Sequence, residues 1–333
     1  MRFGLFGSAE ARRGGSGADR ARGYHAFVEA QVEAEALGYH VTFVTEHHFG
    51  GIGQVSDTLG LLSWVAAATR TLRVGTAVIV LPWHDPIILA ERAATLDLLS
   101  GGRLDLGIGR GYRHTEFEGF MMPVEEAQAR FDEAHALMVK AWTSNERFSH
   151  EGRFWRYKDI IIEPTPAQDP HPTLWIAAGN PESIAKAAAL GCNLLLDQFA
   201  SPALIGERVA LYKRSVEASG RPFDPYSVAV ARNIFVAENA GELEAALERQ
   251  RKMHANMIRL SARPDKQNRS HIMRYTDQPG GTEAYSIYGS PEQVMEQINV
   301  LRDVGVRTVL VSAGSQRRTT MQRLAKRIMP EFL

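Results

Sequence analysis

The stretch LRVGTAVIVLPWHDPIILAERAATLDLLSGGRLDLGI, residues 72–108, has the pattern of a β-strand, an α-helix and a second β-strand. Its first part, Leu72–Val80, is apolar on both faces, as a parallel strand covered by helices requires. A helical pattern then runs over Pro86–Leu99, and Ser100-Gly101-Gly102 ends it before Arg103–Ile108. This unit favours a parallel sheet with helices packed on its faces.

The same alternation continues outward in both directions from this unit. We expect eight strands, at Arg2–Gly7, His40–Thr45, Leu72–Val80, Arg103–Ile108, Leu174–Ala178, Asn193–Leu196, Ser227–Val236 and Arg307–Ser312. We expect helices at Arg20–Leu37, Asp57–Arg70, Pro86–Leu99, Glu125–Trp142, Pro181–Leu190, Pro202–Ser219, Gly241–Ile258, Pro291–Val304 and Gln316–Pro330. Eight strand–helix units close naturally into an α/β fold of the (β/α)8 TIM-barrel type. A doubly wound open sheet is the alternative, because periodicity alone does not establish closure.

Two stretches interrupt the alternation. Glu146–Thr165, after the fourth strand, is aromatic and basic with a turn at Gly152, which predicts an inserted hairpin. Its aromatic residues could line a pocket, but at these spacings they more often fasten a hairpin to a barrel. Ser261–Ser286, before the last strand–helix units, has no periodicity, and a loop of this length indicates a mobile lid. No low-complexity linker divides the chain, so we expect one domain over residues 1–333.

The composition limits the classes of partner. Of the 333 residues, 44% are hydrophobic, and 38 Lys and Arg balance 38 Asp and Glu. No net field therefore favours nucleic acid or an anionic membrane. The one cysteine, Cys192, lies in an apolar run, which predicts a buried structural thiol and fits a reducing compartment. Without a signal-peptide pattern or an apolar run of ~20 residues, we expect a cytoplasmic protein.

In such barrels the site lies at the carboxyl ends of the strands, where the strongest feature is Glu46-His47-His48-Phe49. Neutral imidazole near pH 7 takes or gives a proton, and adjacent residues on a strand point in opposite directions. One alternative is a pair of structural histidines; another is a metal site completed by His84, Asp85 and His114. The divergence of the pair and the absence of a His-Glu-x-x-His helix argue against metal.

Two further strand ends have features that attract an anion. Gly107-Ile108-Gly109-Arg110-Gly111 combines small residues with one guanidinium, and arginine binds phosphate with two hydrogen bonds. After the fifth strand, Asn180 is a good N-cap, Pro181 suits the first helical turn, and the Ser183 hydroxyl lies nearby. A tight turn alone explains the first feature, and a simple helix cap alone explains the second. The two features together favour a bound phosphate.

These motifs, in their order and spacing, resemble the bacterial luciferase-like monooxygenases over nearly the whole chain. The resemblance rests on blocks at residues 46–49 (EHHF), 74–82 (VGTAVIVLP), 96–103 (LDLLSGGR), 107–111 (GIGRG) and 288–292 (YGSPE). It implies a (β/α)8 barrel, usually a homodimer, that binds reduced FMN (FMNH2) supplied by a separate NAD(P)H-dependent flavin reductase. The implied activity is that of a two-component monooxygenase, in which O2 forms a peroxide at the flavin C4a and oxygenates a small organic substrate.

Three other functions remain open beside this one. Deazaflavin (F420)-dependent enzymes share the architecture and transfer hydride without oxygen. A non-catalytic flavin-binding protein and a metal-dependent hydrolase are the remaining alternatives. The sequence carries no motif that identifies the substrate.

The resemblance also assigns roles to individual residues. It implies that His47 is the catalytic histidine, that Arg110 binds the FMN phosphate, and that Ala77-Val78 forms a non-proline cis peptide beneath the flavin ring. The other residues expected at the cofactor are Glu46, Thr76, Gly111, Tyr112, Gly179, Asn180, Ser183, Asp197 and Gln198. Luciferases carry a reactive cysteine where this chain has Gly109, and Ser-Trp where it has Asp197-Gln198. Those departures alter the pocket wall and argue against light emission from a long-chain aldehyde.

Overall fold

The computed structural model describes residues 1–11, 14–261 and 285–332. The strand pairing is that of the predicted closed (β/α)8 barrel of parallel strands. The chain forms two compact units, each described by itself below. The first unit consists of Met1–Gly7, Glu29–Phe43 and Trp175–Leu333, and the second of Ser8–Val28 and Val44–Leu174.

The strands of the first unit run parallel, in the order β8, β9, β10, β12, β1 and β2. Their bounds are β1 (Arg2–Gly7), β2 (Val41–Val44), β8 (Thr173–Ala177), β9 (Asn193–Leu196), β10 (Val228–Val236) and β12 (Thr308–Ser312). A further short strand, β11 (Ile287–Gly289), pairs with the end of β10. Sequence periodicity did not predict β11, because three residues are too few to show an alternation.

Three helices of this unit begin at an Asn-Pro or Ser-Pro pair, and the others pack on the sheet through apolar faces. They are the end of α1 (Gly17–Ala36), α6 (Pro181–Ala189), α7 (Pro202–Ala218), α8 (Ala240–Ser261), α10 (Pro291–Asp303) and α11 (Arg317–Arg327). The side chains of Asn180, Ser201 and Ser290 cap α6, α7 and α10, each followed by proline in the first turn. These caps explain why the predicted helix starts are correct.

The strands of the second unit are β3 (Arg73–Thr76), β4 (Ile79–Val80) and β5 (Leu104–Gly109). Both β3 and β4 pair with β5 in parallel. The prediction of one continuous strand over Leu72–Val80 is therefore wrong in one respect, because the chain leaves the ladder at Ala77 and Val78. The peptide bond between those two residues is cis, as the family resemblance predicts.

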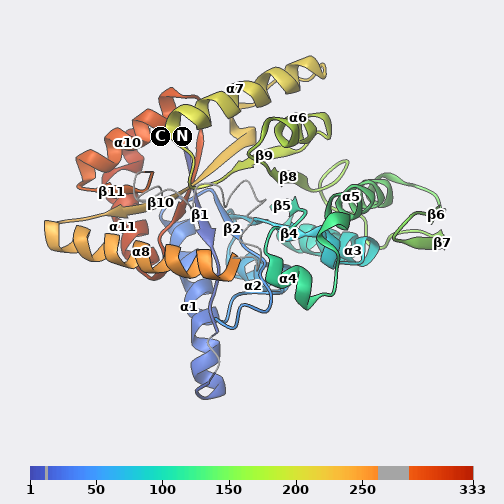
Figure 1. The fold of residues 1–333 in the computed structure, drawn as a ribbon, viewed down its shortest axis with the longest axis horizontal. Coiled ribbons are helices and arrows are strands. Elements are labelled where there is room, and N and C mark those ends of the chain that lie inside the picture. The colour runs from blue at the N-terminus through green and yellow to red at the C-terminus, as the bar shows by residue number, and fades with distance from the viewer. Residues whose placement is uncertain (12–13, 262–284, 333) are drawn as a thin grey trace. The chain divides into compact units, whose positions relative to one another are not determined.

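The helices of the second unit are α2 (Thr58–Ala68), α3 (Pro86–Ser100), α4 (His114–Gly119) and α5 (Ala127–Thr143). The predicted insertion is the antiparallel hairpin β6 (Phe148–Glu151) and β7 (Arg156–Ile160), which projects beyond α5 (Figure 1). The Glu133 carboxylate on α5 accepts hydrogen bonds from the amides of Phe154 and Trp155, and Arg130 lies 4.3 Å from the Phe154 ring centre. The hairpin's aromatic residues thus fasten it to α5.

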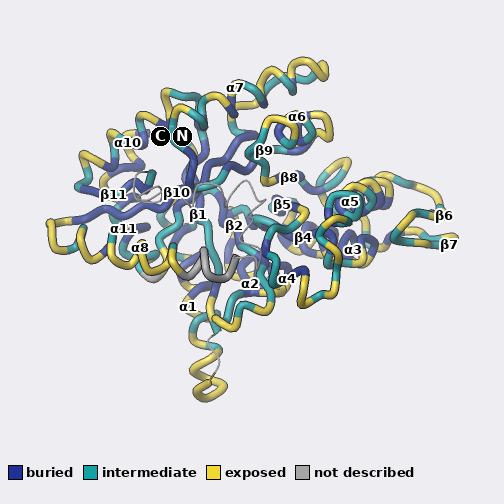
Figure 2. Tube along the Cα trace, viewed as in Figure 1, coloured by how far each residue is buried: buried dark blue, intermediate teal, exposed yellow. Residues whose placement is uncertain are grey.

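The core follows the predicted strands, and all nine residues of β10 are buried (Figure 2). Cys192 is fully buried, which confirms the predicted burial of its thiol, and burial raises the pKa of that thiol to about 12. Among the helices that the structure describes, none combines the length and apolarity needed to cross a membrane. Of the expected lid over Ser261–Ser286, residues 262–284 lie outside the described residues.

Candidate active site

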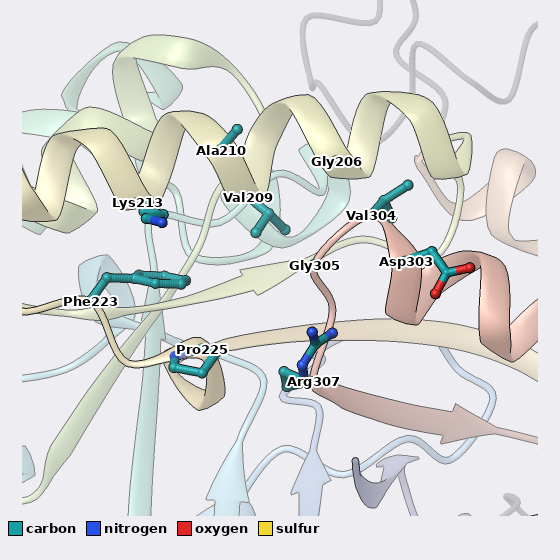
Figure 3. Close-up of a pocket in the computed structure, with 10 residues that line it drawn as sticks. All are labelled: Gly206, Val209, Ala210, Lys213, Phe223, Pro225, Asp303, Val304, Gly305 and Arg307. Carbon is teal, nitrogen blue, oxygen red and sulfur yellow. The ribbon is translucent and has the colours of Figure 1, made fainter. Parts of the chain in front are cut away.

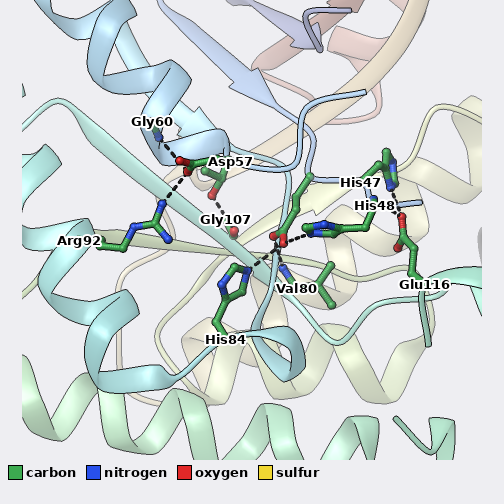
Figure 4. Close-up of polar contacts among 11 residues, drawn as sticks. His47, His48, Asp57, Gly60, Val80, His84, Arg92, Gly107 and Glu116 are labelled. Atoms are coloured by element: carbon green, nitrogen blue, oxygen red, sulfur yellow. Dashed lines mark hydrogen bonds and ion pairs between the residues drawn. The ribbon is translucent and has the colours of Figure 1, made fainter. Parts of the chain in front are cut away.

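The two adjacent histidines turn to two different buried carboxylates within the second unit. His47 Nδ1 lies 3.0 Å from Glu116 Oε1, and His48 Nε2 lies 2.7 Å from Glu46 Oε1 (Figure 4). The predicted divergence of the pair is therefore observed. Glu116 also accepts a hydrogen bond from the His48 amide and lies 3.7 Å from the Arg113 guanidinium. Because a carboxylate so placed only accepts, the Nδ1 proton of His47 points at Glu116 and the Nε2 lone pair is left for a ligand.

His47 is held neutral near pH 7 by its surroundings. Burial lowers the pKa of its imidazole below the ordinary 6.5, and the charge of Arg113 lowers it further. The hydrogen bond to Glu116 opposes this shift without reversing it. A neutral imidazole with a fixed tautomer can accept a proton at Nε2 and return it, as acid–base chemistry requires.

Glu46 joins three segments of the second unit. Its Oε1 accepts hydrogen bonds from His48 Nε2 at 2.7 Å and from His84 Nε2 at 2.8 Å, and its Oε2 accepts one from Val80 N at 2.9 Å (Figure 4). Three of the four acceptor positions of the carboxylate are thus taken by protein donors. Burial alone would raise the pKa of Glu46, but these hydrogen bonds outweigh it and hold the pKa below its ordinary value.

An aromatic cluster packs beside His48. The rings of Trp83 and Phe120 stack with centres 4.9 Å apart, Trp83 meets Phe117 edge-on at 4.5 Å, and Phe120 meets His48 at 5.0 Å. Phe49 extends the cluster, with its ring 4.8 Å from that of Phe120. These rings exclude water from one side of the histidine segment.

The turn after β5 needs its two glycines. A Cβ at Gly109 would lie 2.5 Å from Val78 Cγ2, and one at Gly111 would lie 2.8 Å from Val80 Cγ1 at a backbone φ of +83°. The cysteine that luciferases carry at the first position therefore has no room here unless Val78 moves. Arg110, between the two glycines, is exposed and forms no ion pair with any residue that the structure describes.

The remaining predicted residues of the second unit lie close to this turn. Tyr112 presents its ring edge-on to His47, with centres 6.3 Å apart. Thr76 is fully buried, and its hydroxyl donates to the Gly107 carbonyl at 2.7 Å, which ties β3 to β5. The Thr76 hydroxyl therefore donates its one proton to the main chain.

In the first unit, Gly179, Asn180 and Ser183 lie at the start of α6. The Asn180 side chain accepts a hydrogen bond from the Ser183 amide at 2.9 Å, so it serves as an N-cap as predicted. Gly179, Asn180 and Ser183 are all partly exposed. The remaining first-turn amides and the Ser183 hydroxyl are the groups that could meet an anion.

Asp197 and Gln198 follow β9 in the same unit and have different surroundings. Asp197 Oδ1 accepts from the amides of Phe199 and Ala200, and its Oδ2 forms a buried ion pair with Arg208 at 2.9 Å. Its carboxylate is thus used by protein groups. The Gln198 Oε1 atom is buried and has no hydrogen-bond partner among the residues described.

The five residues considered as metal ligands have other partners: His47 contacts Glu116, and His48 and His84 both contact Glu46. His114 pairs with Glu118 at 3.1 Å, and Asp85 caps α3 and accepts from the Tyr157 hydroxyl at 2.9 Å. Across residues 1–11, 14–261 and 285–332, no group of three or more His, Cys, Asp or Glu side chains is arranged to hold a metal ion.

The first unit has a pocket of about 500 Å³ (Figure 3). It is lined by Val209 and Lys213 of α7, by Phe223 and Pro225 before β10, and by Arg307 before β12. These residues lie at the amino ends of the strands, whereas barrel enzymes have their active sites at the carboxyl ends.

Glu116, Arg113 and the Glu46–His84 contact are the parts of the site that sequence reasoning did not identify. Glu116 is buried on α4, a six-residue helix with too little periodicity to be predicted, and its partner His47 is 69 residues away. His84 was considered only as a metal ligand. The one available signal was the position of His84 directly after the third strand, at the same barrel end as Glu46.

Comparison with known proteins identifies the family of the chain. A family model described as luciferase-like monooxygenase matches residues 1–308. The flavin-dependent trigonelline monooxygenase, oxygenase component, of Acinetobacter baylyi is 24% identical over 357 residues, covering 100% of this chain and 96% of the relative.

Two solved structures share the fold over essentially their whole length. The oxygenating constituent of 3,6-diketocamphane monooxygenase from Pseudomonas putida, in complex with FMN, superposes with a TM-score of 0.82 at 19% identity, covering 100% of this chain and 99% of that one. An F420-dependent secondary alcohol dehydrogenase in complex with an F420-acetone adduct gives a TM-score of 0.79 at 16% identity, with the same coverage. At these identities the structural likeness concerns the fold alone. Since the family model spans most of the sequence, the chain belongs to the luciferase-like monooxygenase family.

Proposed function

We propose that this protein is the oxygenase component of a two-component, FMNH2-dependent monooxygenase that acts on a small organic substrate. The observation that carries the proposal is His47, a neutral imidazole whose side chain is 13% exposed, whose Nδ1 is fixed by Glu116 and whose Nε2 has no partner among the described residues and is left for a ligand. We propose His47 as the catalytic residue, because it can hold or move a proton at Nε2.

The residues present fit a flavin that carries a phosphate. In the second unit, Arg110 offers a guanidinium that forms no ion pair with the described residues, and Gly111 lets the main chain approach a ligand closely. In the first unit, the start of α6 offers amides and the Ser183 hydroxyl. We propose that Arg110 is the phosphate-binding residue of the second unit, where Ala77, Val78 and Tyr112 lie along the flavin ring. For the first unit we propose Gly179, Asn180 and Ser183 as phosphate-binding residues.

The protein's own contribution is to orient groups, exclude water and control one proton. Reduced FMN, when bound, supplies the electrons that activate O2 for transfer of one oxygen atom to the substrate. His47 Nε2 accepts or returns the proton that this transfer displaces, while Glu116 keeps the ring in one tautomer. Glu46 and Thr76 hold neighbouring segments in place. Glu46 accepts hydrogen bonds from His48, His84 and Val80, and Thr76 donates one to the Gly107 carbonyl. The Trp83, Phe117 and Phe120 rings keep water away.

The test is oxygenation with isotopically labelled dioxygen. Purified protein is supplied with FMN, an NAD(P)H-dependent flavin reductase and a panel of ketones, aldehydes and aromatic nitrogen heterocycles, the classes suggested by the relatives' names. We expect one labelled oxygen atom in the product, formed only when the reductase is present. His47→Gln should reduce product formation by ~10²- to 10⁴-fold at saturating FMN. The matched control is His114→Gln, because His114 lies on α4, is 21% exposed and pairs with the exposed Glu118; this variant should retain activity.

Hydride transfer from F420 is the second candidate, since that cofactor is bound by a protein of the same fold. Titration with FMN and with F420, followed by fluorescence, separates the two. Tight binding of F420 and product formation without O2 would replace the monooxygenase proposal. Binding of FMN with no turnover across the panel would favour a non-catalytic flavin-binding protein.

We propose also that the protein works in the cytoplasm, as its sequence pattern led us to expect, and that it is a homodimer, as the family resemblance implies. Sedimentation equilibrium of the purified chain measures its mass in solution. A mass of one 36.9 kDa chain at the concentrations used for assay would contradict the dimer.

A further inference from the structure

The turn Asp197–Ala200, which follows β9 in the first unit, is held by five protein contacts. Asp197 Oδ1 accepts from the amides of Phe199 at 2.8 Å and Ala200 at 3.1 Å. Asp197 Oδ2 pairs with Arg208, and both side chains are more than 90% buried. The turn is therefore closed on itself and tied to α7.

Arg232 of β10 fixes the same turn from the other side. Its side chain is 1% exposed, and its guanidinium donates to the carbonyls of Asp197 at 2.9 Å and Ala200 at 2.8 Å. Burial lowers the pKa of Arg232 to about 10, so it stays charged at neutral pH. A buried cation that donates to both ends of a four-residue turn leaves the turn with a single conformation.

Gln198 is the residue that this rigid turn presents. Its Oε1 atom is buried and accepts no hydrogen bond from the described part of the chain. A buried acceptor without a donor destabilises a protein by its lost hydration, and such atoms are rare in native structures. Every other polar group of the turn that we have named is paired, so Gln198 stands out as unsatisfied.

We infer that the rigid Asp197–Ala200 turn positions Gln198 for ligand binding. The amide oxygen of Gln198 accepts a hydrogen bond from an N–H or O–H group of a bound ligand. This deepens the proposed function and rests on it for the identity of the ligand. Two sources offer such a donor: the imide N–H that FMN and F420 share, and a hydroxyl or N–H of the organic substrate. Asp197 then holds the turn and does not contact the cofactor, which refines its predicted role.

Gln168 provides a matched comparison within the same chain. It is also half-buried, but its amide is fully used: Nε2 donates to Asp97 and to the Leu104 carbonyl, and Oε1 accepts from Thr173. Leucine at residue 168 removes satisfied hydrogen bonds, whereas leucine at residue 198 removes an unsatisfied atom. The two substitutions should therefore have opposite effects on the ligand-free protein.

The experiment compares Gln198→Leu, Gln168→Leu and wild type by thermal melting without ligand, by FMN and F420 titration, and by KM on the labelled-oxygen panel. Gln198→Leu should keep or raise the melting temperature while weakening one ligand about tenfold. A higher Kd for the flavin identifies the cofactor as the donor, and a higher KM with unchanged flavin Kd identifies the substrate. Gln168→Leu should lower the melting temperature and leave the flavin Kd unchanged.

Two results would overturn the inference about Gln198. One is a melting temperature that falls in Gln198→Leu as far as in Gln168→Leu, since this would make Gln198 a structural residue. The other is unchanged flavin Kd and unchanged KM in Gln198→Leu. If wild type binds neither FMN nor F420, the proposed function fails, and the melting comparison still decides whether Gln198 is satisfied without ligand.

Discussion

The replacement of Glu116 by glutamine probes the arrangement that orients His47. The carboxylate lies 3.0 Å from both His47 Nδ1 and the His48 amide, and its side chain is 2% exposed. Glutamine has nearly the same shape and keeps one oxygen acceptor for these donors. The substitution therefore removes the charge and preserves most of the geometry.

The size of the effect follows from the loss of that charge. A hydrogen bond to a charged group contributes about 1.5–3 kcal/mol, and one between neutral groups about 0.5–1.5 kcal/mol. The difference of roughly 1–2 kcal/mol corresponds to a decrease of about 5- to 30-fold in kcat/KM. Glu116 also raises the pKa of His47 against the larger effect of burial, so its loss should lower that pKa further. The acid limb of the activity profile should then move to lower pH.

The assay is the pH dependence of labelled-oxygen incorporation at saturating FMN. Glu118→Gln is the matched control, because Glu118 lies on the same helix, is 59% exposed and pairs only with His114 in the described structure. We expect the control to stay within about twofold of wild type, as exposed ion pairs contribute little. The reasoning is refuted if Glu116→Gln keeps full activity, or if its acid limb moves to higher pH.

Three other predictions concern stability, each measured by urea unfolding. Gly109→Cys places a Cβ 2.5 Å from Val78 Cγ2 and should reduce the unfolding free energy by ~1–3 kcal/mol; an unchanged value would contradict this packing. Asp197→Ala removes the buried Arg208–Asp197 ion pair and should cost ~3–5 kcal/mol, whereas Glu244→Ala, which removes an exposed ion pair with Arg251 on α8, should cost less than ~1 kcal/mol. Because the folded-state pKa of His47 lies below 6.5, the unfolded state binds more protons as pH falls through 6.5, and stability should decrease there. His47→Gln should remove that part of the slope, and an identical slope in both proteins would argue against a buried neutral imidazole.

The fold was predictable because its signals are local. The strands Arg2–Gly7 and Asn193–Leu196 have the predicted bounds, and the caps Asn180 and Ser290, each followed by proline, placed helix starts correctly. The break at Ala77–Val78 came from the family resemblance, because an unbroken apolar run gives no local sign of it.

The partners within the site were not predictable in the same way. Glu116 sits on a helix of six residues whose apolar face is too short to give a period, and its contact with His47 exists only once the chain has folded. Likewise, Glu46 and His84 are 38 residues apart, and nothing in their neighbouring residues indicates that one accepts from the other. Single site residues at strand ends can be identified from a sequence pattern. Which of these side chains contact one another depends on how separate helices and strands pack in the folded chain.

The most direct test of the central claim is labelled-oxygen yield from His47→Gln and wild type, measured side by side at equal FMN occupancy with the same reductase. We predict that wild type places one atom from dioxygen in the product and that His47→Gln, with FMN still bound, loses this activity by ~10²-fold or more. Equal yields from the two proteins, or product formed without any labelled oxygen, would contradict the account.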